Sequence, residues 1–147
     1  MKLVIAADHG GYDIKEKIKT ALLEKGHDVE DLGTDNGTDS VDYPLFAKAL
    51  CKEIQEGRAE LGILCCGTGI GMSMVANKQK GIRAAVLSDE FSAEMTRRHN
   101  NANVLCLGGR VLSDERAVLL AELFVNTPFE GGRHQRRIDK ISALEEN

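Results

Sequence analysis

The sequence predicts an α/β fold, a three-layer α/β/α sandwich around a parallel β-sheet. Five short apolar stretches alternate along the chain with amphipathic stretches, which is the pattern of strands connected by helices. The apolar stretches are nearly continuous, as expected for strands that helices cover on both faces. No repeat, low-complexity tract or linker interrupts this pattern, so residues 1–147 are expected to form a single Rossmann-like domain.

The first half of the chain predicts two strand–helix units. "KLVIAA" (2–7) has the apolar character of a buried strand and ends at the turn sequence "DHGG". Apolar residues then recur with helical spacing over 12–25, and Gly26 is expected to end this helix. "HDVEDLG" (27–33) predicts a shorter strand. A polar loop leads to a helix over 44–57 that begins with a proline, as first helical turns often do.

The second half predicts three further units and a last helix. The strands are expected at 61–66, 81–88 and 103–109, and the helices that follow them at 69–78, 89–100 and 113–125. A charged helix is expected from about Arg133 onward. It carries Ile138, Ile141 and Leu144 on one stripe, so it is expected to dock on another surface, and a partner subunit is a candidate.

Composition and charge exclude several classes of protein. Apolar residues make up 42% of the chain and charged residues 29%, which are ordinary values for a globular domain. The net charge of -4 argues against non-specific nucleic-acid binding. No run approaches the roughly 20 apolar residues that span a bilayer, so no membrane association is expected. Because "MKLVIAADHGG" lacks the pattern of a signal peptide, the chain is expected in the cytoplasm.

The chain has four cysteines, and two of them are adjacent. Cys51, Cys65, Cys66 and Cys106 include no C-x-x-C pair, which excludes a zinc ribbon and a thioredoxin-type motif. Neighbours in a strand face opposite sides, so Cys65 and Cys66 make a poor chelate and no structural metal is expected. We expect Cys65 in the core. Cys66 precedes a helix whose first amides favour a thiolate, which makes it a candidate base or nucleophile.

Polar and glycine-rich residues follow four of the predicted strands, at 8–11, 65–71, 88–89 and 108–110. Ligands of parallel α/β sheets bind beyond the carboxyl ends of the strands, so these residues mark the expected site. The loop "CGTGIGM" carries Gly67, Gly69 and Gly71. It lacks the third glycine of a dinucleotide fingerprint and the lysine of a P-loop. Its backbone N–H groups are expected to hold an anion or a developing oxyanion, the alternative being a turn without a role.

Histidines and arginines supply further candidates. His9 follows the first strand, and His99 follows the fourth predicted helix; each has a purely structural role as its alternative. Arg133 and Arg137 share one helix face and, with Arg110, are candidates for binding one phosphate, unless they form a solvated helix end. With two Tyr, four Phe and no Trp, the chain lacks the aromatic residues of a nucleic-acid surface, so a small phosphorylated ligand fits better.

Six blocks of the sequence together resemble the ribose-5-phosphate isomerase B family, which also contains galactose-6-phosphate and allose-6-phosphate isomerases. The blocks run in order over nearly the whole chain, and the C-G-T-G-x-G-M-S and E-G-G-R-H motifs are the most specific. They are "ADHGG" (7–11), "DYP" (42–44), "GILCCGTGIGMSMVANK" (62–78), "GIRAA" (81–85), "RRHNNANVLCLGGRV" (97–111) and "FEGGRHQRRIDKI" (129–141).

The resemblance implies a five-stranded parallel sheet and a homodimer or dimer of dimers with the active site at the subunit interface. It also implies an isomerase without metal or organic cofactor, which interconverts D-ribose 5-phosphate and D-ribulose 5-phosphate through an enediolate. The roles it implies are Cys66 as the base, Thr68 as a proton relay, His99 with Asp8 in ring opening, the amides of Gly67, Gly69 and Gly71 as oxyanion donors, His9, Arg110, Arg133 and Arg137 at the phosphate, and Tyr43 and Asn100 at the sugar.

Two departures and three alternatives accompany this resemblance. Gly10 replaces the usual small or hydrophobic residue after D-H, and Ile70 stands where some relatives without the cysteine have a carboxylate. One alternative is isomerisation of a hexose 6-phosphate, although the galactose enzymes typically divide their catalytic residues between two different subunits. Another is a non-catalytic phosphosugar sensor. A redox role of Cys65 and Cys66 is disfavoured, because a vicinal disulfide is strained.

Overall fold

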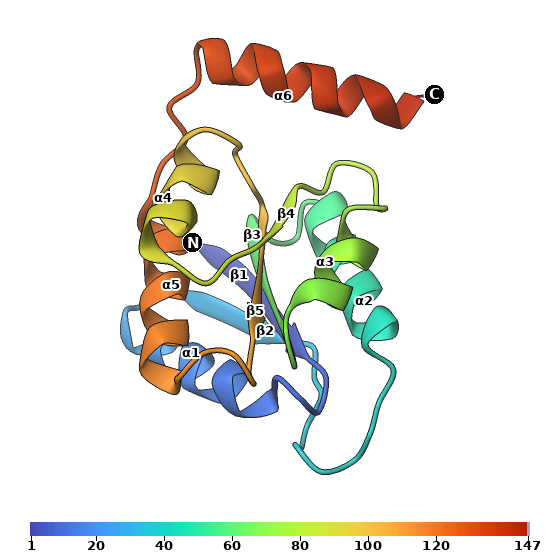
Figure 1. Cartoon of the computed structure of the whole chain (residues 1–147), viewed down its shortest axis with the longest axis vertical. Helices are drawn as coiled ribbons and strands as arrows, with labels where there is room; N and C mark the ends of the chain where they lie inside the picture. Colours follow the sequence, from blue (N-terminus) through green and yellow to red (C-terminus); the bar gives the residue numbers. More distant parts are fainter. Residues whose placement is uncertain (147) are drawn as a thin grey trace.

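Five parallel strands form one sheet in the order β2-β1-β3-β5-β4 in the computed structural model, which describes residues 1–146 (Figure 1). Adjacent strands pair in parallel throughout the sheet. This confirms the predicted α/β class and the number of strands. The strands are β1 (Lys2–Ala7), β2 (Asp28–Asp31), β3 (Leu61–Cys66), β4 (Ala84–Val86) and β5 (Val104–Gly108).

Helices cover both faces of the sheet, as the continuous apolar strands require. Figure 1 shows α1, α4 and α5 on one face and α2 and α3 on the other. The helices are α1 (Tyr12–Glu24), α2 (Tyr43–Gln55), α3 (Ile70–Ala76), α4 (Glu90–Arg98), α5 (Asp114–Asn126) and α6 (Arg133–Ala143), and a short 3-10 turn (Leu144–Glu146) follows the last of them.

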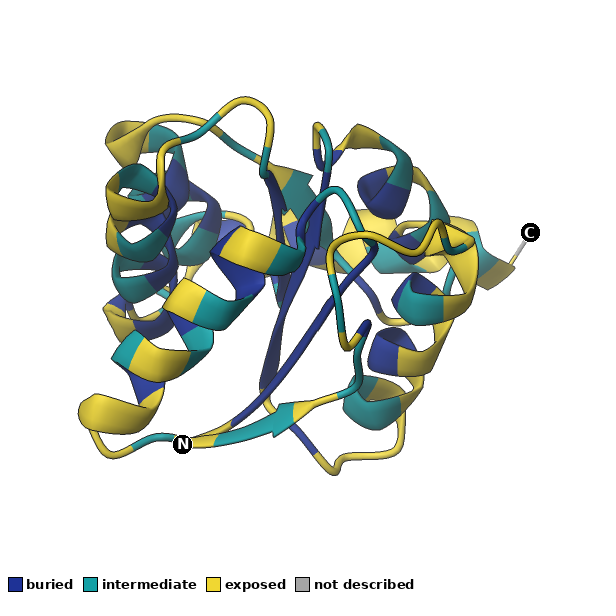
Figure 2. Ribbon diagram, turned by 90° about the horizontal axis from the view of Figure 1, so that it is seen from below, coloured by how far each residue is buried: buried dark blue, intermediate teal, exposed yellow. Residues whose placement is uncertain are grey.

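Each face of the sheet has its own hydrophobic core. Ile18 of α1 and Phe124 of α5 belong to one core, and Leu50 of α2 and Met72 of α3 belong to the other. Figure 2 shows that the central strands and the inward sides of the helices are buried, whereas the outward sides of the helices are exposed. Because side chains alternate across a strand, every strand of the centre contributes to both cores.

The edge strands are shorter than predicted. The sequence predicts a strand over 81–88, but only Ala84–Val86 pair with β5, and Gly81 ends the turn after α3 with a φ of 77°. An edge strand has one neighbour only, so its ends lack the second ladder that holds a central strand straight. The predicted strand over 27–33 is likewise reduced to Asp28–Asp31. The third predicted helix ends at Ala76.

The last helix, α6, belongs to neither layer and lies across the amino ends of the strands (Figure 1). Ile138 of α6 is buried, but Ile141 is 50% exposed and Leu144 is 69% exposed. The apolar stripe predicted for this helix is therefore covered only at its first residue within one chain. None of the helices formed by residues 1–146 is long and apolar enough to cross a lipid bilayer.

Candidate active site

Most of the predicted site residues come together at the carboxyl edge of the sheet, where loops that follow β1, β3 and β5 meet the start of α2. Backbone hydrogen bonds join the three loops to one another: Asp8 N–H donates to Cys65 O at 3.1 Å, and Arg110 N–H donates to Gly67 O at 2.9 Å. The residues gathered at this edge are Asp8, His9, Tyr43, Cys66, Gly67, Thr68, Gly69, Gly71 and Arg110.

Cys66 is the last residue of β3 and is only 5% exposed. Its Sγ accepts a hydrogen bond of 3.1 Å from the N–H of Gly69, which has the left-handed φ of 82°. A donor of this kind binds a thiolate more strongly than a thiol, because hydrogen bonds to ionised acceptors are the stronger ones. The turn after the strand is therefore shaped around the sulfur of Cys66.

The other three cysteines lie in apolar surroundings. Cys65 faces the core opposite to that of Cys66, as the alternation of a strand predicts. Burial raises the pKa of the Cys65 thiol far above its usual range, raises that of Cys51 to about 11, and raises that of Cys106 as well. These three thiols remain protonated at neutral pH and cannot act as bases.

The glycine loop has free amide groups, although fewer than predicted. Gly69 N–H is used by Cys66 Sγ, and Ile70 N–H donates to Thr68 Oγ1 at 3.3 Å. Within residues 1–146, the N–H groups of Gly67, Thr68 and Gly71 have no acceptor. These three amides, rather than the amide of Gly69, are available to an anionic oxygen.

Asp8 and His9 are held in fixed orientations after β1. The carboxylate Oδ1 of Asp8 accepts from the N–H groups of Gly10 at 2.9 Å and Gly11 at 3.2 Å, and the residue is 7% exposed. Val41 N–H donates to Nδ1 of His9 at 3.2 Å. A neutral histidine that accepts at Nδ1 carries its proton on Nε2, so His9 presents a donor at its other end.

Two glycines let the loops approach backbone to backbone. A Cβ on Gly11 would lie 2.2 Å from the carbonyl carbon of Cys65, and a Cβ on Gly109 would lie 2.4 Å from Gly10 O. A larger residue at Gly11 would push the loop after β1 away from Cys65, and a larger residue at Gly109 would push it away from the loop after β5. The "DHGG" and "LGG" sequences are thus required by contact between loops, which is a stronger reason than turn formation.

Tyr43 and Arg110 lie on either side of the glycine loop. The ring of Tyr43, in the first turn of α2, would be 2.7 Å from a Cβ on Gly71. The guanidinium of Arg110 lies over Gly67, where Nη1 would be 3.1 Å from a Cβ. An aromatic ring and a positive charge therefore flank the free amides.

The remaining predicted residues lie at the opposite, amino edge of the sheet. His99 caps the C-terminus of α4, and Asn100 follows it, before β5 begins at Val104. Gly108, at the other end of β5, pairs with Cys66, and the strand alone rises about 13 Å between these ends. One chain therefore does not bring His99 to Cys66. Arg133 and Arg137, on α6, lie at the amino edge with His99 (Figure 1).

His99 has two neighbours at this edge, Glu130 and His134, that were not among the predicted site residues. Its ring stacks on that of His134 with centroids 4.1 Å apart, and its Nε2 lies 3.4 Å from Oε2 of Glu130. Burial, reinforced by the charges of His99 and Arg133, lowers the pKa of His134. The i, i+4 spacing of Glu130 and His134 could have indicated that the two side chains lie together. However, Gly131 and Gly132 separate them, so no helix was expected there.

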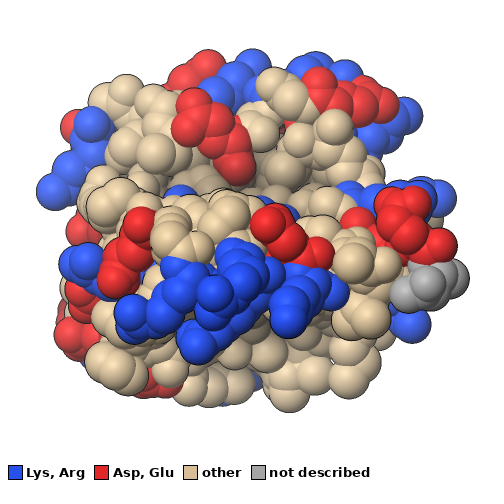
Figure 3. Space-filling view, turned by 90° about the horizontal axis from the view of Figure 1, so that it is seen from above, with Lys and Arg blue, Asp and Glu red and all other residues tan. Residues whose placement is uncertain are grey.

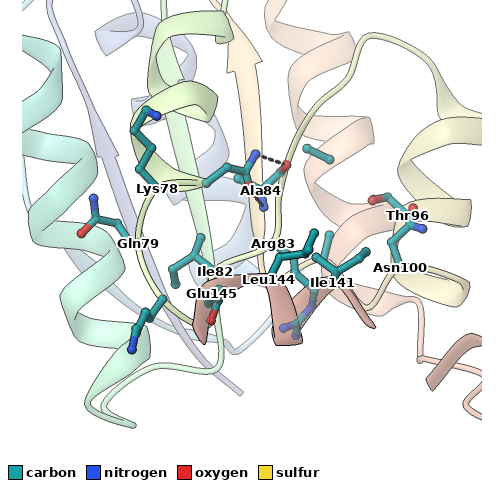
Figure 4. Close-up of a pocket in the computed structure, with 14 residues that line it drawn as sticks. Lys78, Gln79, Ile82, Arg83, Ala84, Thr96, Asn100, Ile141, Leu144 and Glu145 are labelled. Atoms are coloured by element: carbon teal, nitrogen blue, oxygen red, sulfur yellow. Dashed lines mark hydrogen bonds between the residues drawn. The ribbon is translucent and has the colours of Figure 1, made fainter. Parts of the chain in front are cut away.

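The amino edge also has a basic surface and a cavity. Figure 3 looks down on this edge and shows a band of basic side chains; on α6 the exposed ones are Arg133, Arg136, Arg137 and Lys140. Beneath α6 lies a cavity of about 890 Å³, and the side chains that line it include Asn100, Arg83, Ile141 and Leu144 (Figure 4). Asn100 thus lines the same cavity as the exposed apolar residues Ile141 and Leu144.

Comparison with known proteins identifies the family of the chain. Residues 3–141 match the Ribose/Galactose Isomerase family. The chain belongs to this family. Ribose-5-phosphate isomerase B of Escherichia coli is 41% identical over 145 residues, which are 99% of this chain and 97% of that protein. The family resemblance seen in the sequence is thereby confirmed.

Solved structures of Ribose/Galactose Isomerase family members have the same fold. The ribose 5-phosphate isomerase of Thermotoga maritima superimposes with a TM-score of 0.93 at 49% identity, over 97% of each chain. The ribose-5-phosphate isomerase B of Mycoplasma genitalium, with bound ribulose-5-phosphate, superimposes with a TM-score of 0.95 at 43% identity, over 99% of this chain and 97% of that one.

Proposed function

We propose that the protein interconverts D-ribose 5-phosphate and D-ribulose 5-phosphate. The observation that carries this proposal is the environment of Cys66, whose sulfur accepts a backbone hydrogen bond beside three unpaired amides. A relative at 43% identity binds ribulose-5-phosphate, and the fold of this chain follows that relative over almost its whole length. The reaction we propose requires neither a metal nor an organic cofactor, and takes place in the cytoplasm as part of carbohydrate metabolism.

The proposed chemistry uses Cys66 as the base. Its thiolate removes the proton from the carbon next to the aldehyde and returns it to the neighbouring carbon, which converts an aldose into a ketose. The enediolate oxygen then accepts hydrogen bonds from the amides of Gly67 and Gly71, which are already in place before the reaction. Thr68, whose hydroxyl is exposed on the loop, moves a proton between the two oxygens. Gly69 holds the sulfur.

We further propose that the complete site forms between two copies of the chain, in a homodimer or a dimer of dimers. The carboxyl edge of one copy supplies Cys66, and the amino edge of the second copy supplies His99. Two features support this arrangement. The two residues are on opposite edges of one chain, and apolar side chains are exposed on both surfaces that would meet. The exposed apolar side chains are Ile70 and Met74 of α3 on one surface. On the other surface they are Ile141 of α6 and Leu144 of the turn that follows α6.

The remaining residues then divide between substrate groups. His9, through its Nε2 donor, and Arg110 bind the phosphate from one copy, and Arg133 and Arg137 bind it from the other. His99 and Asp8 open the sugar ring by proton transfer, while Tyr43 and Asn100 contact the sugar. A hexose 6-phosphate is the second candidate substrate, because the matching family includes galactose isomerases. Discrimination by one carbon unit is worth only about 1–3 kcal/mol.

The decisive experiment is turnover of ribose 5-phosphate by purified, EDTA-treated protein, with allose 6-phosphate and galactose 6-phosphate in parallel. Fast conversion of the pentose is the expected result. Conversion of a hexose phosphate alone would retain the mechanism and change the substrate. If none of the three is converted but each still binds, the proposal is wrong and the protein is a phosphosugar sensor.

A further inference from the structure

A cluster of two imidazoles and one carboxylate lies at the amino edge. His99, Glu130 and His134 each offer one ligand atom, and these atoms all lie within 4.8 Å of one another. They come from three segments that hydrogen bonds and helix ends hold in place. His99 caps α4, Glu130 N–H donates to Arg98 O at 3.1 Å, and His134 lies in the first turn of α6.

We propose that His99, Glu130 and His134 form a binding site for a divalent transition-metal ion, and that an ion bound there inhibits the isomerase. Imidazole nitrogen with one carboxylate oxygen is a ligand set that suits Zn²⁺, Co²⁺ and Ni²⁺. Metal binding stands on the geometry alone, whereas inhibition rests on the proposed function. The reason for inhibition is that a metal occupies the nitrogen lone pair that His99 needs for proton transfer.

The cluster can surround an ion once one imidazole ring has rotated. Zinc–nitrogen bonds are about 2.0–2.1 Å long, so ligand atoms around a tetrahedral ion lie roughly 3.3 Å apart. The Nε2 atom of His99 and Oε2 of Glu130 are already 3.4 Å apart. The stacked ring of His134 must rotate out of its parallel arrangement with His99, because the lone pair of an imidazole lies in the plane of the ring.

One ligand of the cluster is buried and one is accessible, and neighbouring charges limit the strength of binding. His134 is 7% exposed. Glu130 supplies a negative charge and is accessible. Arg133 and Arg137 stand on the same helix and repel a dication. The site is therefore suited to reversible capture and release of an ion, as an inhibitor requires.

Co²⁺ is the probe of choice, because its visible absorption distinguishes nitrogen and oxygen ligands from thiolate. EDTA-treated protein, freed of EDTA, is titrated with Co²⁺ in phosphate-free buffer and followed by absorption and calorimetry. We expect one ion per chain without a sulfur charge-transfer band. Glu130→Gln and His134→Asn should each weaken binding by about tenfold or more. Cys66→Ala and His27→Ala, the thiol and histidine controls, should bind as the wild type does.

Three results would overturn the site: no binding at millimolar Co²⁺, unchanged binding in Glu130→Gln, or loss of binding in Cys66→Ala. Glu130 is exposed, so its variant tests the site even where His134→Asn fails to fold. The inhibition is tested separately, by turnover of ribose 5-phosphate. Co²⁺ should slow the wild type, EDTA should restore it, and Glu130→Gln should need about tenfold more Co²⁺. Unaffected turnover in the Co²⁺-loaded protein would refute inhibition while leaving the binding site in place.

Discussion

Cys66 and His99 lie at opposite ends of the same sheet. Cys66 closes β3 at the carboxyl edge, and His99 precedes β5 at the amino edge, so the length of the sheet separates the two side chains. A single chain cannot present both to one carbon atom of a substrate. The proposed reaction therefore depends on how two chains meet.

A mixture of two inactive variants should regain activity. Cys66→Ala and His99→Asn each remove one half of every composite site. A mixed dimer combines the intact Cys66 of one chain with the intact His99 of the other, and so has one working site. Random reassembly should restore about a quarter of the wild-type rate, because half of the dimers are mixed and each has one of two sites.

Turnover is measured after joint unfolding and refolding, or after subunit exchange. Each variant refolded alone is the control, and it should remain inactive. A mixture that stays as inactive as its components, although mass spectrometry detects mixed dimers, would contradict the composite site.

Replacement of Cys66 should separate chemistry from binding. Cys66→Ala removes the proposed base, and general base catalysis commonly contributes about 10²–10⁴-fold, so kcat should fall by that order. The amides of Gly67 and Gly71 remain, so the substrate should still bind. Kinetics of ribose 5-phosphate turnover give kcat, and calorimetric titration of the sugar phosphate gives its affinity for the variant.

Cys65→Ala is the matched control for this prediction. Cys65 lies in the opposite core and its thiol is held protonated, so its loss should leave kcat within about threefold of the wild type and cost about 1 kcal/mol of stability. A large loss of kcat in this variant together with a mild one in Cys66→Ala would reverse the two assignments.

A methyl group at Gly11 should destabilise the fold. Its Cβ would lie 2.2 Å from the carbonyl carbon of Cys65, so two backbones must move apart. We expect Gly11→Ala to lower the free energy of unfolding by about 3 kcal/mol or more, measured by urea denaturation.

Gly26→Ala separates the effect of contact from that of backbone conformation. Gly26 has a φ of 88°, and no atom beyond its two chain neighbours lies within 4 Å of the position that a Cβ would occupy, so only the left-handed conformation opposes the change. Its cost should be about 1–2 kcal/mol. Equal losses in the two variants would show that contact between the loops is not the reason for Gly11.

The ion pair of Lys15 and Asp31 should make stability depend on pH. Lys15 Nζ, whose side chain is 2% exposed, donates to both carboxylate oxygens of Asp31 at 2.7 and 2.9 Å. Burial alone would raise the pKa of Asp31, but hydrogen bonds from Lys15, Lys19 and the N–H of Gly33 outweigh it and lower that pKa. The stabilisation is then present above the unfolded pKa of about 4 and is lost as pH falls through the lower, folded pKa.

Asp31→Asn should cost about 2–3 kcal/mol at pH 7, because Lys15 stays buried and keeps only the carboxylate of Glu16, at 3.1 Å, as an ionised partner. The difference from the wild type should shrink as pH falls below about 4. Denaturant titrations at several pH values measure this. Glu90→Gln, which breaks the exposed contact with Arg116, is the control and should change stability by about 0.5 kcal/mol or less. A difference for Asp31→Asn that persists unchanged at low pH would disprove the linkage.

Much of the fold could be predicted because local pattern and tertiary structure agree. The strand at 61–66 matches β3 residue for residue, and Gly26 ends α1 as predicted. The edge strands could not be delimited, because apolar residues (Ile82 and Leu87) also lie on either side of Ala84–Val86, and only the single neighbour of β4 limits its pairing. The hydrophobic pattern of a sequence indicates that a segment forms a strand, but it does not indicate how many strands pair with it.

The site was predictable in part, for reasons that differ between its two halves. The carboxyl edge follows from a general rule for parallel sheets, so Asp8, Cys66 and Arg110 were recognisable from their place after a strand. The position of His99 was also readable, since it follows a helix and precedes a strand, yet its separation from Cys66 emerges only when the strands are aligned. The stack of His99 on His134 depends on the path of the chain through Gly131 and Gly132, which no local pattern encodes.

The adjacent cysteines illustrate how little separates a core residue from a reactive one. Cys65 is aligned with Leu107 and Cys66 with Gly108, so the parity of the position along β3 alone decides which sulfur meets the loop. Insertion of one residue between Leu61 and Cys65 would turn both cysteine side chains to the opposite faces of the sheet without altering either side chain. The reactivity of a cysteine at this place therefore depends on the register of β3 in the sheet. A shift in that register would abolish the activity although both cysteines remain in the chain.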